Sequence, residues 1–269
     1  MKHQSWKQRW KHRPSRIARA FLPWLVPTLI AIAWEISART GWLSSRVLPE
    51  PLAVLEAGWH LAQTGELWQH LKISAWRALA GFAIGGGFGL FFGLLTGSSR
   101  IAETALDTTL QMLRNIPLLA TIPLVILWFG IDETAKLFLI AFGVFFSVYS
   151  NTFHGIRSVD PALIEMGRSY GLNGWRLYRD VILPGALSSI LVGVRYALGF
   201  TWLILIVAET ISAQAGIGYM TMNAREFLQT DVVLLGILLY ALLGKLADMF
   251  ARGLERWLLR WNAAYLGTA

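Results

Sequence analysis

The sequence contains no cysteine, and histidine is scarce. Without cysteine, the chain can form neither a disulfide bond nor a thiolate metal site. Its five histidines, at positions 3, 12, 60, 70 and 154, do not have the spacing of metal ligands. The chain also lacks a G-x-x-x-x-G-K-[ST] phosphate loop and any arrangement of serine, histidine and acid for hydrolysis. We therefore expect no catalytic residues, no metal site and no cofactor bound by this chain itself.

Apolar residues, in contrast, are abundant. They make up 55% of the 269 residues, and the mean hydropathy is +0.50, whereas soluble domains average about 45–50% apolar residues. The apolar residues occur in long blocks, which predict an all-α membrane protein with about six transmembrane helices. We expect one transmembrane domain (21–252) between a basic N-terminal tail (1–20) and a C-terminal tail (253–269). The predicted spans are 21–38, 78–97, 116–131, 134–150, 185–208 and 232–251.

Positive charge is unevenly distributed along the chain. Seven of the 24 lysines and arginines lie in the first 19 residues, directly before the first predicted span. Such a tail could bind nucleic acid, but its position before a span favours a cytoplasmic anchor that contacts anionic lipid headgroups. If the N-terminus is cytoplasmic, the inner segments carry sixteen basic residues and the outer segments five. The positive-inside rule therefore predicts that both termini and the segment 160–184 lie in the cytoplasm.

Two predicted spans contain glycines or prolines at informative positions. In the second span a glycine recurs at every fourth residue from Gly81 to Gly97, which predicts close packing against a neighbouring helix. Pro117 and Pro123 interrupt the third span. A proline removes a helical hydrogen bond and kinks the helix, and broken helices often line a transport path. Pro123 is therefore a candidate path residue, and a simple packing kink is the alternative.

Two ionisable residues belong to the fifth predicted span. Arg195 lies near its middle, where a charged group costs at least ~2.5–3.5 kcal/mol unless it has a partner or water, and Glu209 lies at its far end. Fourteen residues separate them, which is roughly 21 Å along a helix, so the two cannot pair directly. Arg195 could bind an anionic substrate bidentately, or it could form an ion pair with another helix.

The segment after the fifth span is rich in small and hydroxylated residues. Ser212 and Gln214 could line the path in a re-entrant turn at the outer mouth, or they could lie in a plain external loop. On the sixth span, Lys245 and Asp248 have the spacing of a helical ion pair, which we interpret as structural. The candidate path residues are therefore Arg195, Pro123, Glu209, Ser212 and Gln214.

The polar segment 160–184 predicts two short helices. An Asp-Pro pair begins it, which is typical of a helix start, and Gly171 is typical of a left-handed cap at a helix end. Asn173 can cap a second helix over 175–183. Two short amphipathic helices between membrane spans indicate a docking surface for another protein.

This segment resembles the cytoplasmic loop of importer-type ABC permeases, the EAA loop, whose pattern is Glu-Ala-Ala-x3-Gly followed by Leu-Pro. The two alanines of the pattern are replaced here by methionine and glycine, and the other positions match. In the family, this loop seats in a groove of the ATPase subunit. The resemblance implies that the matching residues couple the chain to an ATPase; they are Glu165, Met166, Gly167, Gly171, Leu183 and Pro184.

The resemblance extends over most of the chain. The strings GELWQH (65–70), IPLVILWFGIDE (122–133), VAETISA (207–213) and YALLGKLAD (240–248) are similar to permeases of bacterial aliphatic-sulfonate importers, within the nitrate, sulfonate and taurine group. This implies a type I ABC importer permease fold in the bacterial inner membrane, and transport of alkanesulfonates; taurine, nitrate or another small anion is the alternative. The implied partners are an ATPase dimer, which binds ATP and Mg, a periplasmic binding protein and a second copy of this chain.

An ion-coupled secondary transporter is the alternative from another functional class. It would need acidic groups near the membrane midplane, and the second, third and fourth predicted spans have none in their middles. It would also work without an ATPase, so stable co-purification with an ATPase distinguishes the two classes.

Overall fold

The computed structural model describes residues 16–40 and 48–261, without the side chains of residues 16–24 and of Ser212. Within these ranges the regular structure is entirely helical, which confirms the predicted all-α class. A π-helical turn, η2 (Tyr178–Ile182), joins α8 to α9. The helices are α1 (Arg16–Arg39), α2 (Pro51–Thr64), α3 (Glu66–Ser98), α4 (Arg100–Arg114), α5 (Leu118–Phe129), α6 (Glu133–Arg157), α7 (Pro161–Ser169), α8 (Gly174–Leu177), α9 (Leu183–Ser212), α10 (Ile217–Glu226) and α11 (Thr230–Leu258).

Four helical segments of the described chain are long and apolar enough to cross a membrane. They are α3, α6, the continuous segment Gly174–Ile211 and α11, and the bent pair of α4 and α5 would make a fifth. A helix, α1, also forms where the first span is predicted, although the side chains of its first nine residues lie outside the described part. The structure thus confirms a protein with several membrane-spanning helices, and the number six stays a prediction.

The third predicted span differs from the structure. We predicted one kinked span over 116–131, but α5 has 12 residues, about 18 Å in length, which is too short for a hydrocarbon core of about 30 Å. The break lies before α5, where the chain turns by 98° between α4 and α5. Pro117 explains this position, because proline disfavours a helical conformation in the residue before it. Pro123, in contrast, lies inside α5 and does not end the helix.

The glycine row of the second predicted span packs against α6, as predicted. A Cβ atom built on Gly85 would lie 2.2 Å from the carbonyl oxygen of Ala141, and one on Gly89 would lie 2.6 Å from that of Phe145. Gly87, which is outside the row, has nothing within 4 Å of such an atom. The glycines therefore allow the backbones of α3 and α6 to touch, which gives dispersion contact where lipid offers no hydrophobic driving force.

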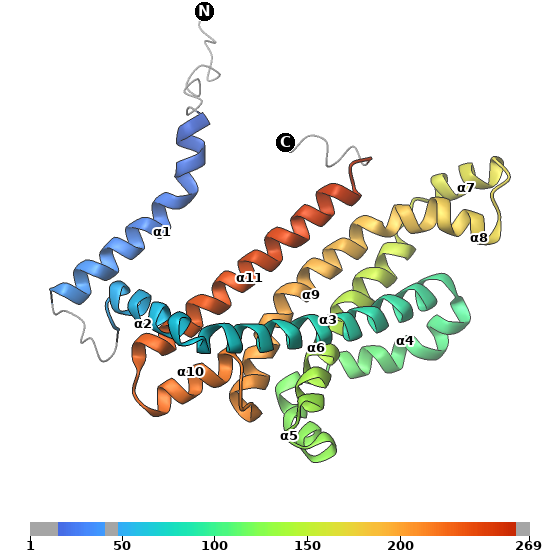
Figure 1. The fold of residues 1–269 in the computed structure, drawn as a ribbon. Coiled ribbons are helices and arrows are strands. Elements are labelled where there is room, and N and C mark those ends of the chain that lie inside the picture. The colour runs from blue at the N-terminus through green and yellow to red at the C-terminus, as the bar shows by residue number, and fades with distance from the viewer. Residues whose placement is uncertain (1–15, 41–47, 262–269) are drawn as a thin grey trace, which may run out of the picture.

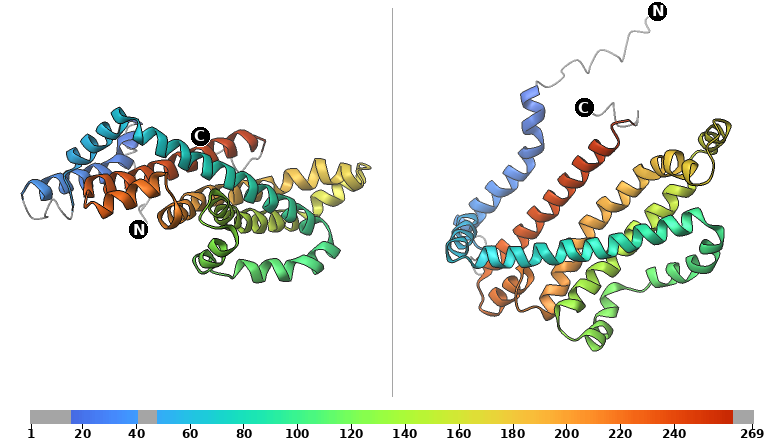
Figure 2. Two further views of the ribbon diagram at one scale, coloured as in Figure 1. Left: turned by 60° about the horizontal axis from the view of Figure 1, so that its bottom comes forward. Right: turned by 45° about the vertical axis from the view of Figure 1, so that its right-hand side comes forward.

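The arrangement of the helices gives the molecule two distinct ends. Helices α6, α9 and α11 run side by side, and α3 lies across α6 and α9 (Figure 1; Figure 2). The buried core lies where α3, α6 and α9 meet, around Ile140, Val144 and Leu205. At one end α7 and α8 project beyond the other helices, and at the opposite end α2 and α10 lie beside the ends of α9 and α11 (Figure 1).

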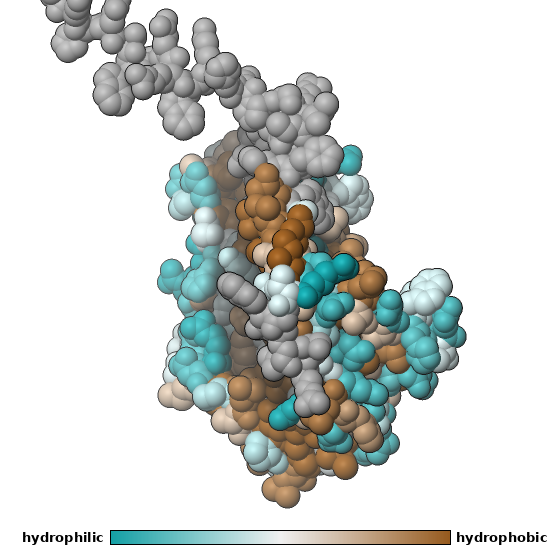
Figure 3. Space-filling model, turned by 90° about the vertical axis from the view of Figure 1, so that its left-hand side faces the viewer, coloured by the Kyte–Doolittle hydropathy of each residue, from teal (hydrophilic) through white to brown (hydrophobic). Residues whose placement is uncertain are grey.

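The outer surface carries many apolar side chains. Leu25, Val26, Leu29 and Ile30 of α1 are more than half exposed. Seen from the side that carries α1 and α2, apolar patches lie beside hydrophilic ones (Figure 3). Large exposed apolar areas are unusual on soluble monomers, so this surface is suited to lipid or to another membrane subunit.

Candidate functional site

The predicted docking segment folds as two short helices at the projecting end. The carboxylate of Asp160 accepts a hydrogen bond from the N–H of Ala162 (2.9 Å) at the start of α7, and Gly171 has φ +80° after its end. The second helix starts after Asn173, as predicted, although the Asn173 side chain makes no capping bond. It differs from the prediction at its other end, because α8 continues through η2 into α9 without a break.

Gly167 lies at the contact between the two short helices. A Cβ atom on Gly167 would lie 2.8 Å from the Cδ1 atom of Leu177 and 3.1 Å from the Cγ2 atom of Val181. Leu177 is itself buried. The glycine that replaces an alanine of the EAA pattern therefore brings the first helix close to the second.

The exposed face of this segment combines large apolar side chains with charged ones. Leu163, Met166, Tyr170 and Trp175 are exposed there, and the ring of Trp175 stacks on that of Tyr178 with centroids 5.8 Å apart. Glu165 is also exposed and forms no ion pair with any residue that the structure describes. A solvent-facing surface that combines large apolar side chains with charges unpaired among the described residues, such as those of Glu165, Arg168 and Arg176, can bind a protein partner.

Glu209 forms the centre of a buried polar network at the opposite end of α9. The residue is 1% exposed. Its carboxylate accepts hydrogen bonds from Ser74 Oγ (2.8 Å), Arg77 Nη1 (2.8 Å), the N–H of Gly218 (2.9 Å) and Tyr240 Oη (3.0 Å). A buried carboxylate needs such partners because desolvation disfavours its charge. The donors come from α3, α10 and α11, so this one side chain joins four helices.

Arg77 extends the network to α6. Its Nε atom lies 2.7 Å from Glu133 Oε2, and Lys136 Nζ lies 3.2 Å from Glu133 Oε1. Two cations and two carboxylates therefore balance each other within the network. Sequence reasoning missed all of these partners of Glu209. The available signal was that one basic residue, Arg77, and two acidic residues, Glu133 and Glu209, all lie near the outer ends of predicted spans.

Arg195 forms an ion pair with another helix, one of its two predicted roles. Its Nε atom lies 2.9 Å from Asp248 Oδ1, and Arg252 Nη2 lies 2.7 Å from Asp248 Oδ2. The predicted Lys245–Asp248 pair is therefore wrong, and Lys245 takes part in no ion pair within the described residues. The physical reason is that α9 packs beside α11 and brings Arg195 to Asp248, while Arg252 is one helical turn from Asp248.

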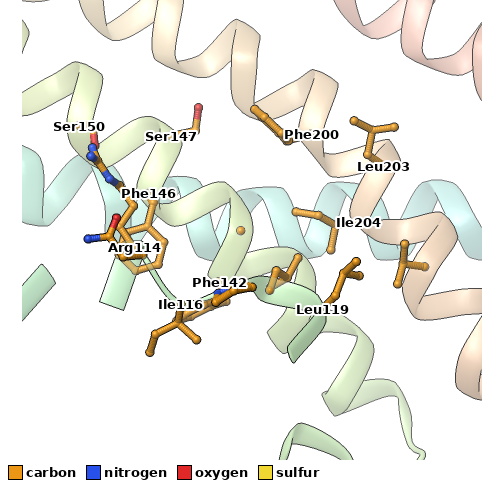
Figure 4. A pocket seen from close by; sticks show the side chains of 15 residues that line it. Arg114, Ile116, Leu119, Phe142, Phe146, Ser147, Ser150, Phe200, Leu203 and Ile204 are labelled. Atoms are coloured by element: carbon orange, nitrogen blue, oxygen red, sulfur yellow. The ribbon is translucent and has the colours of Figure 1, made fainter. Parts of the chain in front are cut away.

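A cavity of about 680 Å³ lies between the corner of α4 and α5, helix α6 and helix α9 (Figure 4). Fifteen residues line it, and most of them are apolar. Its polar side chains are those of Arg114, Asn115, Ser147 and Ser150. Arg114 Nη1 lies 3.3 Å from Ser150 Oγ, and Figure 4 shows this pair on one side of the cavity with Phe200 on another.

None of the predicted path residues is among the fifteen that line this cavity. Pro123 is exposed on α5, Gln214 is exposed between α9 and α10, and Glu209 faces its donors in the buried network. The side chain of Ser212 lies outside the described part. A role of these residues in a transport path stays a prediction.

Sequence reasoning counted Arg114 among the sixteen inner basic residues and did not single it out; the structure places it beside Ser150 of α6. The signal for it was its place directly before the broken span. A cation three residues before Pro117 lies at the kind of helix break that lines transport paths.

Comparison with known proteins identifies a family, relatives of similar sequence and a solved structure of similar fold. Residues 85–260 match the family described as binding-protein-dependent transport system inner membrane component. The chain is 64% identical to the putative aliphatic sulfonates transport permease protein SsuC of Escherichia coli, over 90% of this chain and 92% of that one. It is 37% identical to the taurine transport system permease protein TauC of the same organism, over 87% and 86%. Its fold is similar to a chain of the crystal structure of an amino acid ABC transporter, with a TM-score of 0.56 at 21% identity, over 68% of this chain and 91% of that one.

Proposed function

This chain belongs to the family of binding-protein-dependent transport system inner membrane components, and on that premise we propose that it carries alkanesulfonates across the bacterial inner membrane. It is the permease subunit of an ATP-driven importer and not an enzyme; a separate ATPase subunit binds ATP and Mg. The assignment of the substrate is supported by the 64% identity to an aliphatic-sulfonate permease, compared with 37% identity to a taurine permease of the same organism.

The proposed assembly is a homodimer with the type I importer fold and both termini in the cytoplasm. Two ATPase subunits bind the two 160–184 segments, and a periplasmic binding protein delivers the substrate at the opposite end. Support comes from the two distinct ends of the molecule: α7 and α8 project at one end (Figure 1), and the buried network around Glu209 lies at the opposite end of α9. Apolar outer faces such as that of α1 then contact lipid or the second copy.

Coupling runs from the docking segment into the membrane through α9. Glu165, Met166, Gly167 and Gly171 form or position the surface that contacts the ATPase. Leu183 and Pro184 begin α9, and the helical path is unbroken from Gly174 to Ile211. Residues of α9 also line the cavity: Phe200, Leu203, Ile204 and Val207. ATP binding that moves the docking segment therefore moves one wall of the cavity, which is the basis of alternating access.

The substrate and the energy source are tested together by uptake. Cells without their own sulfonate and taurine importers would express this chain with its ATPase and binding-protein partners, and uptake of labelled ethanesulfonate would be measured. We expect uptake that falls to background when the ATPase carries an inactivating substitution. Uptake of taurine or nitrate instead would keep the transporter class and change the substrate, whereas uptake with an inactive ATPase would favour an ion-coupled transporter.

The role of Glu165 is tested by reversing its charge. We expect Glu165→Lys to reach the membrane at the normal level and to lower ATP-dependent uptake by about tenfold or more, because a misplaced charge in an interface costs several kcal/mol and 1.4 kcal/mol corresponds to tenfold. The matched control is Glu255→Lys, which reverses a carboxylate in the last turns of α11, outside both the docking segment and the end assigned to the binding protein. Normal uptake by Glu165→Lys at normal membrane level would contradict the coupling role.

A further inference from the structure

We propose that the cavity at the corner of α4 and α5 binds an organic sulfonate, with Arg114 holding the anionic head and the apolar wall holding the carbon chain. The inference rests on the proposed function, because it takes a sulfonate as the cargo, and it adds the site within the permease where that cargo is held. It depends on the position of Arg114 beside a membrane-spanning helix, on its lack of a charged partner and on the chemistry of the lining.

Arg114 is an exposed residue that contacts a membrane-spanning helix. Its hydrogen-bond partner Ser150 is in α6, which is one of the membrane-spanning segments. Ser150 lies seventeen residues after the first residue of α6 and seven before the last, which is roughly 26 Å and 10 Å along the helix. A charged group beside the apolar part of a span is disfavoured unless it has a partner or water, so an exposed arginine at this position marks a candidate site for an anion.

Arg114 has no carboxylate partner among the described residues. Other arginines near or within the spans do have such partners. Arg77 pairs with Glu209, Arg157 with Glu103, and Arg195 with Asp248. Arg114 contacts the neutral hydroxyl of Ser150 instead. Its place in the last turn of α4 favours a cation, but the partial charges of a helix end do not fully neutralise a guanidinium. A bound anion would.

The polar groups beside Arg114 match a sulfonate head. A guanidinium has five N–H donors in a planar fork, which fits two oxygens of an oxyanion at once. Because Ser150 Oγ accepts the bond from Arg114, its own hydrogen is free to donate, and Asn115 adds an amide to the lining. The third oxygen of a sulfonate can accept from these groups.

The rest of the lining matches a carbon chain. Phe142, Phe146, Phe200, Leu203 and Ile204 form apolar walls (Figure 4). The volume of about 680 Å³ is within the range of small-molecule sites. A fully polar anion such as nitrate would leave this wall without a partner, so the cavity favours an anion that carries an alkyl group.

Binding is tested on the purified complex of this chain with its ATPase in lipid nanodiscs, without the binding protein. The probe is labelled butanesulfonate. We expect saturable binding, an affinity at least about tenfold lower in Arg114→Gln, and an intermediate affinity in Arg114→Lys, which keeps the charge but loses the planar fork. The control is Arg100→Gln, which removes one exposed charge from the other end of α4 and should bind as the wild type does.

A second variant tests the apolar wall independently of the charge. Leu203→Asn changes an exposed lining residue, so the chain should still fold. We expect it to weaken binding of butanesulfonate more than binding of methanesulfonate, whereas Arg114→Gln should weaken both by the same factor. Loss of both ligands to the same extent in Leu203→Asn would contradict the assigned orientation.

The site and the proposed function can fail separately. If the wild type transports sulfonate in cells and Arg114→Gln, at equal membrane level, binds and transports it as well as the wild type, the site is refuted and the function stands. If wild-type cells take up no sulfonate although the purified complex binds it through Arg114, the function is refuted instead. Absence of saturable binding to the wild-type complex would also refute the site.

Discussion

Replacing Arg77 by glutamine is expected to lower the free energy of unfolding by about 3–5 kcal/mol, which is the usual effect of removing one partner of a buried ion pair. The side chains of Arg77 and Glu209 are 3% and 0% exposed. Without Arg77, Glu209 keeps neutral donors but loses its counter-charge, and Glu133 keeps only Lys136. For a chain of this size we expect the thermal midpoint in detergent to fall by on the order of 10 °C.

Two further variants make this result specific to the buried charge. Arg39→Gln breaks the exposed pair of Arg39 and Glu35 and should cost less than about 1 kcal/mol. The double variant Arg77→Gln with Glu209→Gln removes both buried charges and should recover part of the lost stability, because no uncompensated carboxylate remains at the centre. Equal midpoints for Arg77→Gln and Arg39→Gln would show that the network does not stabilise the fold.

Replacing Gly85 by alanine is expected to destabilise the protein by about 1–3 kcal/mol or more, as overpacking of a close contact does. The new methyl group would lie 2.2 Å from the carbonyl oxygen of Ala141, and a backbone atom cannot rotate away as a flexible side chain can. Helix α3 must therefore move away from α6 along their shared contact. Thermal unfolding in detergent and the amount of protein in the membrane both measure the effect.

Gly87→Ala is the matched control in the same helix. A methyl group at Gly87 meets nothing within 4 Å, and alanine favours a helix over glycine by up to about 1 kcal/mol. We expect an unchanged or slightly higher thermal midpoint. If Gly85→Ala is as stable as Gly87→Ala, the close contact of α3 and α6 does not depend on the glycine row.

The features that could be predicted from the sequence are those that depend on local chemistry. The glycine row has a fixed spacing, so one residue type at every fourth position identifies a helix face whatever its partner. Likewise, the Asp-Pro start and Gly171 mark the ends of a helix through their own backbone preferences. Both predictions are confirmed, since α7 ends before Gly171 and the row from Gly81 to Gly97 faces α6.

The features that could not be predicted depend on which helices meet. Glu209 pairs with Arg77, 132 positions earlier in the chain, and Arg195 pairs with Asp248 on α11. Hydropathy marks a segment as membrane-spanning but does not give its neighbours, so spacing alone predicts Lys245 as the partner of Asp248. The turn of 98° between α4 and α5 is also absent from the hydropathy pattern, and it is this turn that brings Arg114 to the cavity.

The unbroken path of α9 from the docking segment to Glu209 has a mechanical consequence. If the network around Glu209 acts as a pivot, α9 is a lever whose driven end is Leu183. Leu183 lies roughly 39 Å from Glu209 and Phe200 roughly 14 Å from it along the helix. A tilt of α9 would therefore displace Phe200, at the cavity, by about one third of the stroke at the driven end. A large movement of the ATPase would thus produce a smaller movement with greater force at the cavity wall.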